Sequence, residues 1–305
     1  MCSNIPVYLK DALAFGINRL TATHVGSPRM NAEVLLMFTL NCDRAYLYAH
    51  PERQLSGDEK NRYDEALAQR SRGVPSQYIT GHQEFWGMDL IVSPAVLIPR
   101  PETEHVIETV LPLARATTSP KIADVGTGSG CIALALAKEL PEAEIHATEI
   151  SPAALEIARA NAVRHQMESR IQFHQTDLLK DLEPNSFDFV VSNPPYVGES
   201  EEDQVQLEVR KFEPRRAVFA GPTGLEVIEQ LIPAACAALK PDGWLVMEMS
   251  VSIADGVRQL LGSWRDMRTA NDLQGIPRVA SARKAQQPSR SSRFQLLRLH
   301  YWGCV

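Results

Sequence analysis

The stretch Ile122-Ala-Asp-Val-Gly-Thr-Gly-Ser-Gly-Cys-Ile132 decides the fold class of this chain of 305 residues. The apolar run Lys121–Val125 is typical of a buried strand, and a helical pattern follows it over Ile132–Leu140. Glycine stands at alternate positions over Gly126–Gly130, where it tolerates positive φ and leaves the backbone bare. A ligand can therefore approach the loop and the first turn of the helix. The stretch predicts a strand, a binding loop and a helix.

After Pro120 the chain alternates strand and helix patterns repeatedly. The predicted strands are Lys121–Val125, Glu144–Thr148, Ile171–His174, Phe187–Ser192 and Trp244–Met249. The predicted helices are Ile132–Leu140, Pro152–His165 and Gly224–Leu239. Alternation of this kind requires a mostly parallel sheet with helices on both faces, so the predicted fold class is α/β.

The residues before this region have a different pattern. Apolar residues recur at helical spacing through residues 1–74, and Ser56 with Glu59 forms a capping-box pattern that opens a helix to Arg72. Short strands are predicted at Tyr78-Ile79, Glu84–Trp86 and Met88–Val92. We therefore expect a helical bundle over 1–74, a hairpin linker over 75–99, the main α/β domain over 100–284 and a disordered tail over 285–305.

Composition and charge exclude several classes of protein. The chain is 44% hydrophobic and 22% charged, which suits a large core, and no apolar run reaches the roughly 18–20 residues of a membrane helix. No secretory leader is visible, the five cysteines lack CxxC spacing, and the eight histidines lack metal-binding spacing. These features predict a cytoplasmic protein without a metal. The net charge is −6, and −12 over residues 81–282, which argues against direct binding of nucleic acid.

Two acidic residues follow the loop at the ends of later strands. Glu149 lies nineteen residues beyond Gly130, where a carboxylate can accept both hydroxyls of a ribose. Asp177 follows a further strand and could accept the amino hydrogen of adenine, with Leu178 supplying a backbone amide and an apolar wall. A solvated glutamate and a turn-capping aspartate are the structural alternatives. The GxGxG spacing after Asp124 favours a nucleoside such as S-adenosylmethionine over a dinucleotide.

The turn Asn193-Pro-Pro-Tyr196 follows another apolar strand. Its two prolines fix φ, remove two N–H donors and force the preceding residues into extended conformations. The Asn193 side-chain oxygen and the Pro194 carbonyl could each accept one hydrogen of a planar NH₂ group, and Tyr196 could stack on its plane. An amide nitrogen is a poor nucleophile, so acceptors that drain its conjugation help most in the transition state. The turn favours methyl transfer to such a nitrogen; a purely structural proline turn is the alternative.

These motifs together resemble a known family. Asp124–Gly130 with Asn193–Tyr196 resembles the class I methyltransferases that act on exocyclic or amide nitrogens. Four further stretches are similar to the HemK/PrmC family: Gly81–Gly87, Leu97–Glu104, Lys211–Pro214 and Asp272–Val279. The resemblance covers roughly residues 5–284. It implies a class I (Rossmann-like) S-adenosylmethionine-dependent methyltransferase with a small N-terminal helical domain. Enzymes of this family methylate the glutamine of the Gly-Gly-Gln motif in class 1 peptide chain release factors.

The resemblance also implies roles for individual residues. Those that would contact S-adenosylmethionine are Gly126, Thr127, Gly128, Ser129, Gly130, Glu149, Asp177, Leu178 and Asn193. Those that would hold the substrate glutamine are Asn193, Pro194, Pro195 and Tyr196, with Asn193, Pro194 and Tyr196 as catalytic residues. The helical domain and the hairpin would help to dock the release factor, and a monomer is expected. One departure from the family pattern is Glu248-Met-Ser250, where Glu-x-Gly is more usual.

Other substrates fit the same turn. A sibling enzyme methylates a glutamine of a ribosomal protein, and Pro99–Glu104 favours the release-factor enzyme over it. Adenine also offers a planar NH₂ group, so an adenine-N6 methyltransferase is a second alternative, which the acidic core segment disfavours. A non-catalytic binding module with the same fold is a third alternative, and the intact loop and turn argue against it.

Overall fold

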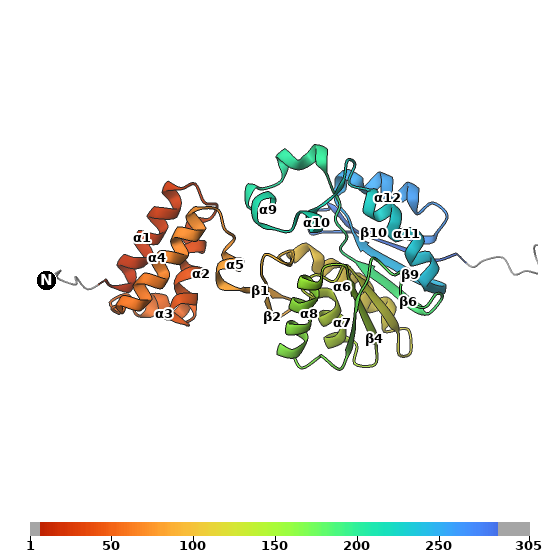
Figure 1. Ribbon diagram of the computed structural model, residues 1–305, viewed down its shortest axis with the longest axis horizontal. Helices are drawn as coiled ribbons and strands as arrows, with labels where there is room; N and C mark the ends of the chain where they lie inside the picture. Colours follow the sequence, from red (N-terminus) through yellow and green to blue (C-terminus); the bar gives the residue numbers. More distant parts are fainter. Residues whose placement is uncertain (1–6, 286–305) are drawn as a thin grey trace, which may run out of the picture. The chain divides into compact units, whose positions relative to one another are not determined.

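The computed structural model describes residues 7–285 (Figure 1), and its contacts divide these residues into two units. The first unit contains the described residues up to Ile98 together with the segment Glu201–Arg215. The second contains Pro99–Ser200 and the described residues from Arg216 onward. The sequence pattern predicts 201–215 within the α/β domain of 100–284, whereas the contacts group this segment with the helical residues. The tail predicted over 285–305 lies, apart from its first residue, outside the described residues.

The first unit is built on helices. They are α1 (Leu9–Ala22), α2 (Pro28–Leu40), α3 (Arg44–Ala49), α4 (Gly57–Ser71) and α5 (Ser76–Thr80). Apolar residues at helical spacing, among them Leu9, Leu20 and Leu36, are fully buried between α1, α2 and α4. The predicted capping box is confirmed, because the Glu59 N–H donates to Ser56 Oγ and the Ser56 N–H donates to the Glu59 carboxylate. A cap of this kind satisfies N–H groups that the first helical turn cannot pair.

A short hairpin follows the helices, formed by β1 (His82–Phe85) and β2 (Met88–Ile91). Its two turn residues, Trp86 and Gly87, both have positive φ, which matches the right-handed twist of the strands. The strand predicted at Tyr78-Ile79 is wrong, because these residues lie in α5. Pro75 at the start of α5 and Gly81, with φ of 77°, at its end confine one helical turn there.

The segment Glu201–Arg215 contains most of the 3₁₀ helix η2 (Glu199–Gln204), all of α9 (Leu207–Phe212) and the first residue of α10 (Arg215–Val218). Two buried polar groups connect it to the rest of the first unit. The buried Arg70 guanidinium pairs with Glu208 at 2.8 Å, and the Ile98 N–H donates to Glu213 Oε2 at 3.1 Å. Buried charges need such partners, which explains the grouping with the helical unit.

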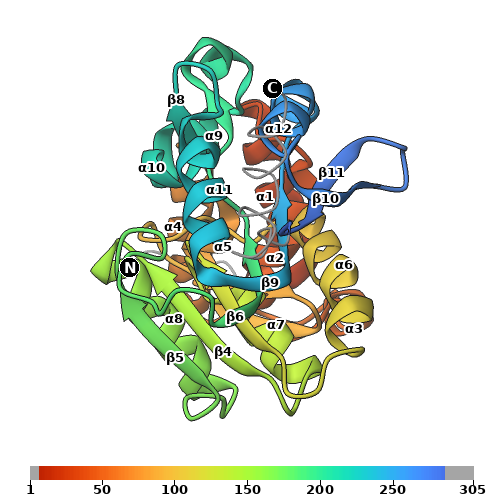
Figure 2. The same cartoon turned by 90° about the vertical axis from the view of Figure 1, so that its right-hand side faces the viewer.

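The second unit contains a seven-stranded sheet in the order β10-β11-β9-β6-β3-β4-β5. Its strands are β3 (Lys121–Val125), β4 (Glu144–Glu149), β5 (Ile171–Gln175), β6 (Phe187–Ser192), β9 (Leu239–Glu248), β10 (Arg265–Asn271) and β11 (Pro277–Arg283). The strands from β9 to β5 in this order pair in parallel, and β11 and β10 are antiparallel. Figure 2 shows β4 and β5 at one edge of the sheet and the β10–β11 hairpin at the other. Short strands β7 (Val197–Gly198) and β8 (Phe219–Gly221) pair separately.

Helices cover both faces of this sheet. α11 (Glu226–Ala238) and α12 (Ala254–Leu260) bury apolar residues against a face that includes Ala123 and Val125. α6 (Glu104–Ala114), α7 (Cys131–Glu139) and α8 (Pro152–Arg164) pack outside that cluster and contact the sheet strands. The 3₁₀ helices η1 (Pro101–Thr103) and η3 (Val251–Ile253) precede α6 and α12. The five predicted α/β strands and three predicted helices are confirmed, each with boundaries within a few residues except at the start of β9.

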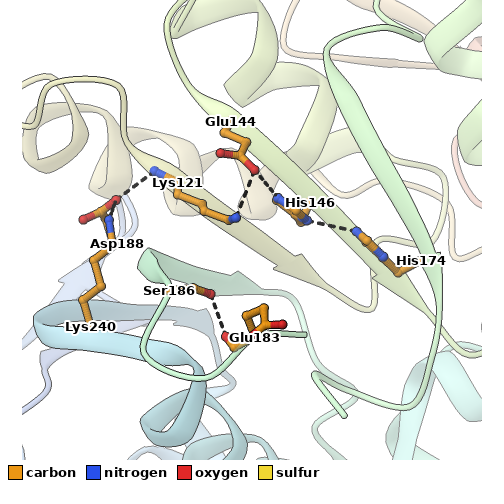
Figure 3. A network of polar contacts seen from close by, with 8 residues as sticks. All are labelled: Lys121, Glu144, His146, His174, Glu183, Ser186, Asp188 and Lys240. Atoms are coloured by element: carbon orange, nitrogen blue, oxygen red, sulfur yellow. Dashed lines mark hydrogen bonds and ion pairs between the residues drawn. The ribbon is translucent and has the colours of Figure 1, made fainter. Parts of the chain in front are cut away.

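A polar network begins at the amino ends of the central strands and extends to His174 on β5 (Figure 3). Glu144 accepts from Lys121 at 3.0 Å and contacts His146 at 2.8 Å, and His146 contacts His174 at 2.9 Å. Burial lowers the pKa of both imidazoles, so each is neutral at pH 7 and one ring nitrogen can donate to the other. Asp188 on β6 accepts from the Lys121 N–H and from Lys240. Lys121, Glu144 and Asp188 lie at the end of the sheet opposite the glycine loop, whereas His174 pairs with Thr148 near the carboxyl ends of the strands.

Over residues 7–285, no helix combines the length and apolar character that a membrane span requires. In the same residues, no group of three or more His, Cys, Asp or Glu side chains is arranged to hold a metal ion.

Candidate active site

The predicted site residues lie at the carboxyl ends of four adjacent strands, which together form one edge of the sheet, here called its carboxyl edge. The register pairs Val125 with Thr148 on one side and with Ser192 on the other. Glu149 pairs with Gln175 one strand farther along. The glycine loop, the acidic residues and the proline turn each begin within two residues of these positions. Ligands of open α/β sheets bind at this edge, so the topology brings the predicted site together.

The glycine loop between β3 and α7 is held by its backbone. The N–H groups of Gly126 and Thr127 both donate to the Thr148 carbonyl, at 2.9 and 3.0 Å. The Gly128 N–H donates to Glu149 Oε2 at 3.1 Å, and the Asn161 side chain donates to the Ser129 carbonyl at 2.9 Å. All three loop glycines have positive φ, of 71°, 57° and 85° in chain order. The loop is therefore a preformed cradle whose shape requires glycine.

The space beside the three loop glycines differs from one glycine to the next. A Cβ added at Gly126 would meet no atom within 4 Å, and one at Gly128 would meet only the Gly126 carbonyl oxygen, at 3.9 Å. A Cβ at Gly130 would instead meet Ala158 Cβ at 3.3 Å, because the start of α7 packs against α8. The space beside the first two glycines is thus open, and the third glycine permits close packing of two helices. Thr127 and Ser129 are buried, so the backbone is what this loop presents.

Asp124 lies beneath the loop at the end of β3 and is fully buried. Its Oδ2 accepts from the Thr127 hydroxyl at 2.6 Å and from the Ala133 N–H at 3.1 Å, whereas its Oδ1 has no hydrogen-bond partner. Burial raises the pKa of this carboxyl to about 7. Through these two hydrogen bonds Asp124 fixes the glycine loop and the first turn of α7 from beneath.

Glu149 is half-buried at the end of β4. Its Oε1 accepts from the Ser151 N–H at 2.9 Å while Oε2 accepts from Gly128. Each carboxylate oxygen has two lone pairs, so acceptor capacity remains for the hydroxyls of a ribose. The hydrogen bond from the Gly128 N–H therefore fixes the orientation of the Glu149 carboxylate beside the glycine loop.

Asp177 and Leu178 follow β5 at the same edge. The Asp177 carboxylate is 43% exposed and pairs with Lys180, so it is accessible and also bonded within its own turn. Leu178 has φ of 54°, a left-handed conformation that costs a non-glycine residue about 1–3 kcal/mol. Its side chain packs against the core beneath α11, which fixes the direction of its backbone. Strained backbone imposed by packing is typical of a binding loop.

The Asn193–Tyr196 turn follows β6 and is anchored at both ends. The Asn193 Nδ2 donates to Thr103 Oγ1 at 3.0 Å, and the Tyr196 hydroxyl donates to Glu248 Oε1 at 3.0 Å. Pro194 is buried, and Pro195 and Tyr196 are half-buried. Burial and the neighbouring Glu248 carboxylate raise the pKa of the Tyr196 phenol, so Tyr196 stays protonated and acts as a donor.

Two residues of this site were not predicted as functional. Thr103 and Glu248 are buried, with 1% and 2% exposure, and the Thr103 hydroxyl donates to Glu248 Oε2 at 2.6 Å. Thr103 lies within the stretch Leu97–Glu104 that resembles the family, and Glu248 opens the stretch Glu248–Ser250 that departs from the family pattern; the two residues are 145 positions apart in the chain. Nothing in local sequence indicates that these two side chains meet.

Comparison with known proteins gives matches along most of the chain. Residues 11–81 match the family described as the PrmC N-terminal domain, and residues 105–211 match the methyltransferase small domain. A release factor glutamine methyltransferase from Koribacter versatilis is 54% identical over 277 residues, covering 90% of this chain and 98% of that protein. One of the same description from Moorella thermoacetica is 40% identical, covering 92% and 99%.

A solved structure shares the fold at low sequence identity. The hMettl16 catalytic domain, crystallised in complex with a 3′UTR hairpin, superposes with a TM-score of 0.54 and 18% identity. The match covers 81% of this chain and 94% of that chain. At this identity the similarity concerns the fold alone.

Proposed function

We propose that this chain, which belongs to the release factor glutamine methyltransferase family, transfers a methyl group from S-adenosylmethionine to the side-chain amide nitrogen (N5) of a glutamine. The substrate is the glutamine of the Gly-Gly-Gln motif in class 1 peptide chain release factors. The observation that carries this proposal is the 54% identity with a relative of that description over 98% of its length. The glycine loop and the Asn193–Tyr196 turn on one sheet edge support it.

S-adenosylmethionine supplies a methyl group on a positively charged sulfur. Gly126–Gly130 would hold it through the backbone, Glu149 through the ribose hydroxyls, and Asp177 with Leu178 through the adenine. Two observations favour these roles: the open space at Gly126 and the hydrogen bond from the Gly128 N–H to Glu149. Thr127 and Ser129 would contribute backbone, because their side chains are buried.

The turn would orient and activate the glutamine amide. The lone pair of the amide nitrogen is delocalised into the carbonyl group. It therefore attacks the methyl group only when the amide is correctly aligned and this delocalisation is reduced. Asn193 Oδ1 and the Pro194 carbonyl would each accept one N–H of the substrate, and Tyr196 with Pro195 would bound the amide plane. These acceptors gain strength as positive charge develops on the nitrogen. The amide proton becomes acidic as the N–CH₃ bond forms, so it can pass to water without a strong base.

Asn193→Ala tests the role of the turn. We expect the turnover of methyl transfer to fall by about 100-fold or more, because an acceptor that acts in the transition state is lost. The affinity for S-adenosylmethionine should change much less, and Asn271→Ala, an exposed asparagine of β10, is the matched control. Near-normal turnover of a folded Asn193→Ala variant would contradict the role.

The remaining parts of the proposal concern partners and location. The helical residues 1–74 and the hairpin of 75–99 would help to dock the release factor, while 100–284 carries the catalytic site. The chain would act as a cytoplasmic monomer without direct contact with nucleic acid, in agreement with the net charge of −12 over 81–282. Light scattering of the protein alone and with release factor tests this: one copy of each in the complex is expected, and a stable dimer of the chain would contradict it.

A further inference from the structure

We propose that Glu248 and Thr103 are positioning residues that determine which atom of the Asn193 side-chain amide faces the substrate. The inference rests on the proposed function in that the substrate is a planar amide held by Asn193. It adds a relay of three buried or half-buried groups that come from separate parts of the second unit: Glu248 at the end of β9, Thr103 at the end of η1, and Asn193 after β6.

The donors and acceptors of the relay allow one arrangement when Glu248 is ionised. A carboxylate can only accept, so the Thr103 hydroxyl must donate its single hydrogen to Glu248 Oε2. The Thr103 oxygen can then only accept from Asn193, and the amide must turn its NH₂ group toward Thr103. The Asn193 oxygen is left facing away from Thr103, free to accept an N–H of the substrate. The alternative amide orientation would place two acceptors against each other.

The other oxygen of Glu248 serves the far end of the turn. Oε1 accepts from the Tyr196 hydroxyl at 3.0 Å, so one carboxylate anchors both Asn193 and Tyr196. Glu248 is 2% exposed, and each of its two hydrogen bonds offsets part of the penalty for burying a charge. Burial, together with Glu102, raises the pKa of Glu248 above its usual range, and the hydrogen bonds from Thr103 and Tyr196 and the Arg278 guanidinium act in the opposite direction, toward the ionised form. Burying an acidic side chain at this position costs more free energy than burying a neutral one of similar size would.

The same relay can assist the chemistry. Positive charge moves onto the substrate nitrogen as the methyl group arrives, and a hydrogen-bonded chain that ends on a carboxylate makes the Asn193 oxygen a stronger acceptor. Because the carboxylate is buried, its field is screened less than that of a surface charge. Glu248 therefore acts on the reaction through Thr103 and Asn193, without touching the substrate.

Three variants test the relay. Thr103→Val keeps the shape of the side chain and removes its hydroxyl, whereas Thr103→Ser keeps the hydroxyl and is the matched control. Glu248→Gln keeps the volume and replaces one acceptor by a donor, which permits the reversed amide orientation. Each variant is assayed as the full chain for methyl transfer to release factor, for binding of S-adenosylmethionine by calorimetry, and for thermal unfolding.

We expect Thr103→Val and Glu248→Gln to lower kcat by about 10- to 100-fold, as small losses of alignment do in oriented reactions. Thr103→Ser should stay within about threefold of the parent, and the affinity for S-adenosylmethionine should stay near the parent value in all three. A merely structural role would move the unfolding temperature and the affinity instead. Parent-like kcat in folded Thr103→Val or Glu248→Gln, or an equal loss in Thr103→Ser, would overturn the proposal.

A second measurement separates this inference from the proposed function. The NMR signals of the Asn193 NH₂ group, assigned by their absence from Asn193→Ala, report the hydrogen bond to Thr103 directly. Protection of these protons from exchange is expected in the parent and in Thr103→Ser and should be lost in Thr103→Val. Failure of the parent to methylate release factor would overturn the proposed function, while an unprotected NH₂ group in the parent would overturn the relay.

Discussion

Alanine at Gly126 and at Gly130 should separate cofactor binding from folding. Both residues have positive φ, 71° and 85°, so alanine is strained at either position. Their surroundings differ: a Cβ at Gly126 meets open space, whereas a Cβ at Gly130 meets Ala158 and Leu134 at 3.3–3.4 Å. The two variants therefore make the same chemical change in one loop with different neighbours.

The structure gives the expected size of each effect. Left-handed backbone costs a residue with a Cβ about 1–2 kcal/mol, so Gly126→Ala should lower the free energy of unfolding by about that amount. Gly130→Ala adds the repacking of α7 against α8, about 1–3 kcal/mol, for a total of about 2–5 kcal/mol. For S-adenosylmethionine the order reverses. The new methyl group at Gly126 fills space that the cofactor would use, and we expect at least about tenfold weaker binding, or about 1.4 kcal/mol.

Urea unfolding followed by circular dichroism measures the first quantity, and calorimetric titration with S-adenosylmethionine measures the second. Gly26→Ala, at a glycine in the helical unit with no atom within 4 Å of its added Cβ, is the control. Affinity unchanged in Gly126→Ala would refute the assignment of the open space to the cofactor. Equal destabilisation by the two loop variants would refute the packing role of Gly130.

Two further predictions concern the acidic residues of the site. Glu149→Ala should raise the Kd for S-adenosylmethionine about tenfold or more, since hydrogen bonds to a charged group each contribute about 1.5–3 kcal/mol, while turnover at saturating cofactor falls less; unchanged Kd in calorimetry would disprove the ribose contact. Burial raises the pKa of Asp124 to about 7 in the folded protein, above its ordinary value of 3.8. The folded state therefore binds this proton more tightly than the unfolded state does. The stability that the protonated group contributes is lost as the pH rises from about 4 to about 7. In urea unfolding without cofactor, the free energy of unfolding of Asp124→Asn should fall less over this pH range than that of the parent, by a difference on the order of 4 kcal/mol. Parallel curves of unfolding free energy against pH for the two proteins would show that burial does not raise this pKa.

The features that sequence predicts here are those with local causes. Glycine at alternate positions and two adjacent prolines restrict the backbone by themselves, so the Gly126–Gly130 loop and the Asn193–Tyr196 turn could be located without a structure. The capping box at Ser56 and Glu59 is equally local. Alternation of strand and helix then indicates a parallel sheet, which places the loop and the turn on one edge.

What sequence did not predict depends on contacts between distant residues. The β10–β11 hairpin has partly exposed, charged residues along Arg265–Asn271 and therefore lacks the apolar signal of a buried strand. The segment 201–215 groups with the helical unit through Arg70 and Glu208, which local pattern cannot connect. Likewise, no local pattern connects Thr103 with Glu248, and only the folded chain brings their side-chain oxygens to 2.6 Å.

Transfer of a labelled methyl group tests the central claim most directly. The purified chain is incubated with labelled S-adenosylmethionine and, in parallel, with a release factor, with the same factor carrying Gly-Gly-Gln→Gly-Gly-Ala, and with ribosomal protein and adenine-containing DNA. The proposed function predicts label on the unaltered release factor alone, lost when the motif glutamine is replaced. Label that persists on the Gly-Gly-Ala factor, or that appears on ribosomal protein or DNA instead, would contradict it.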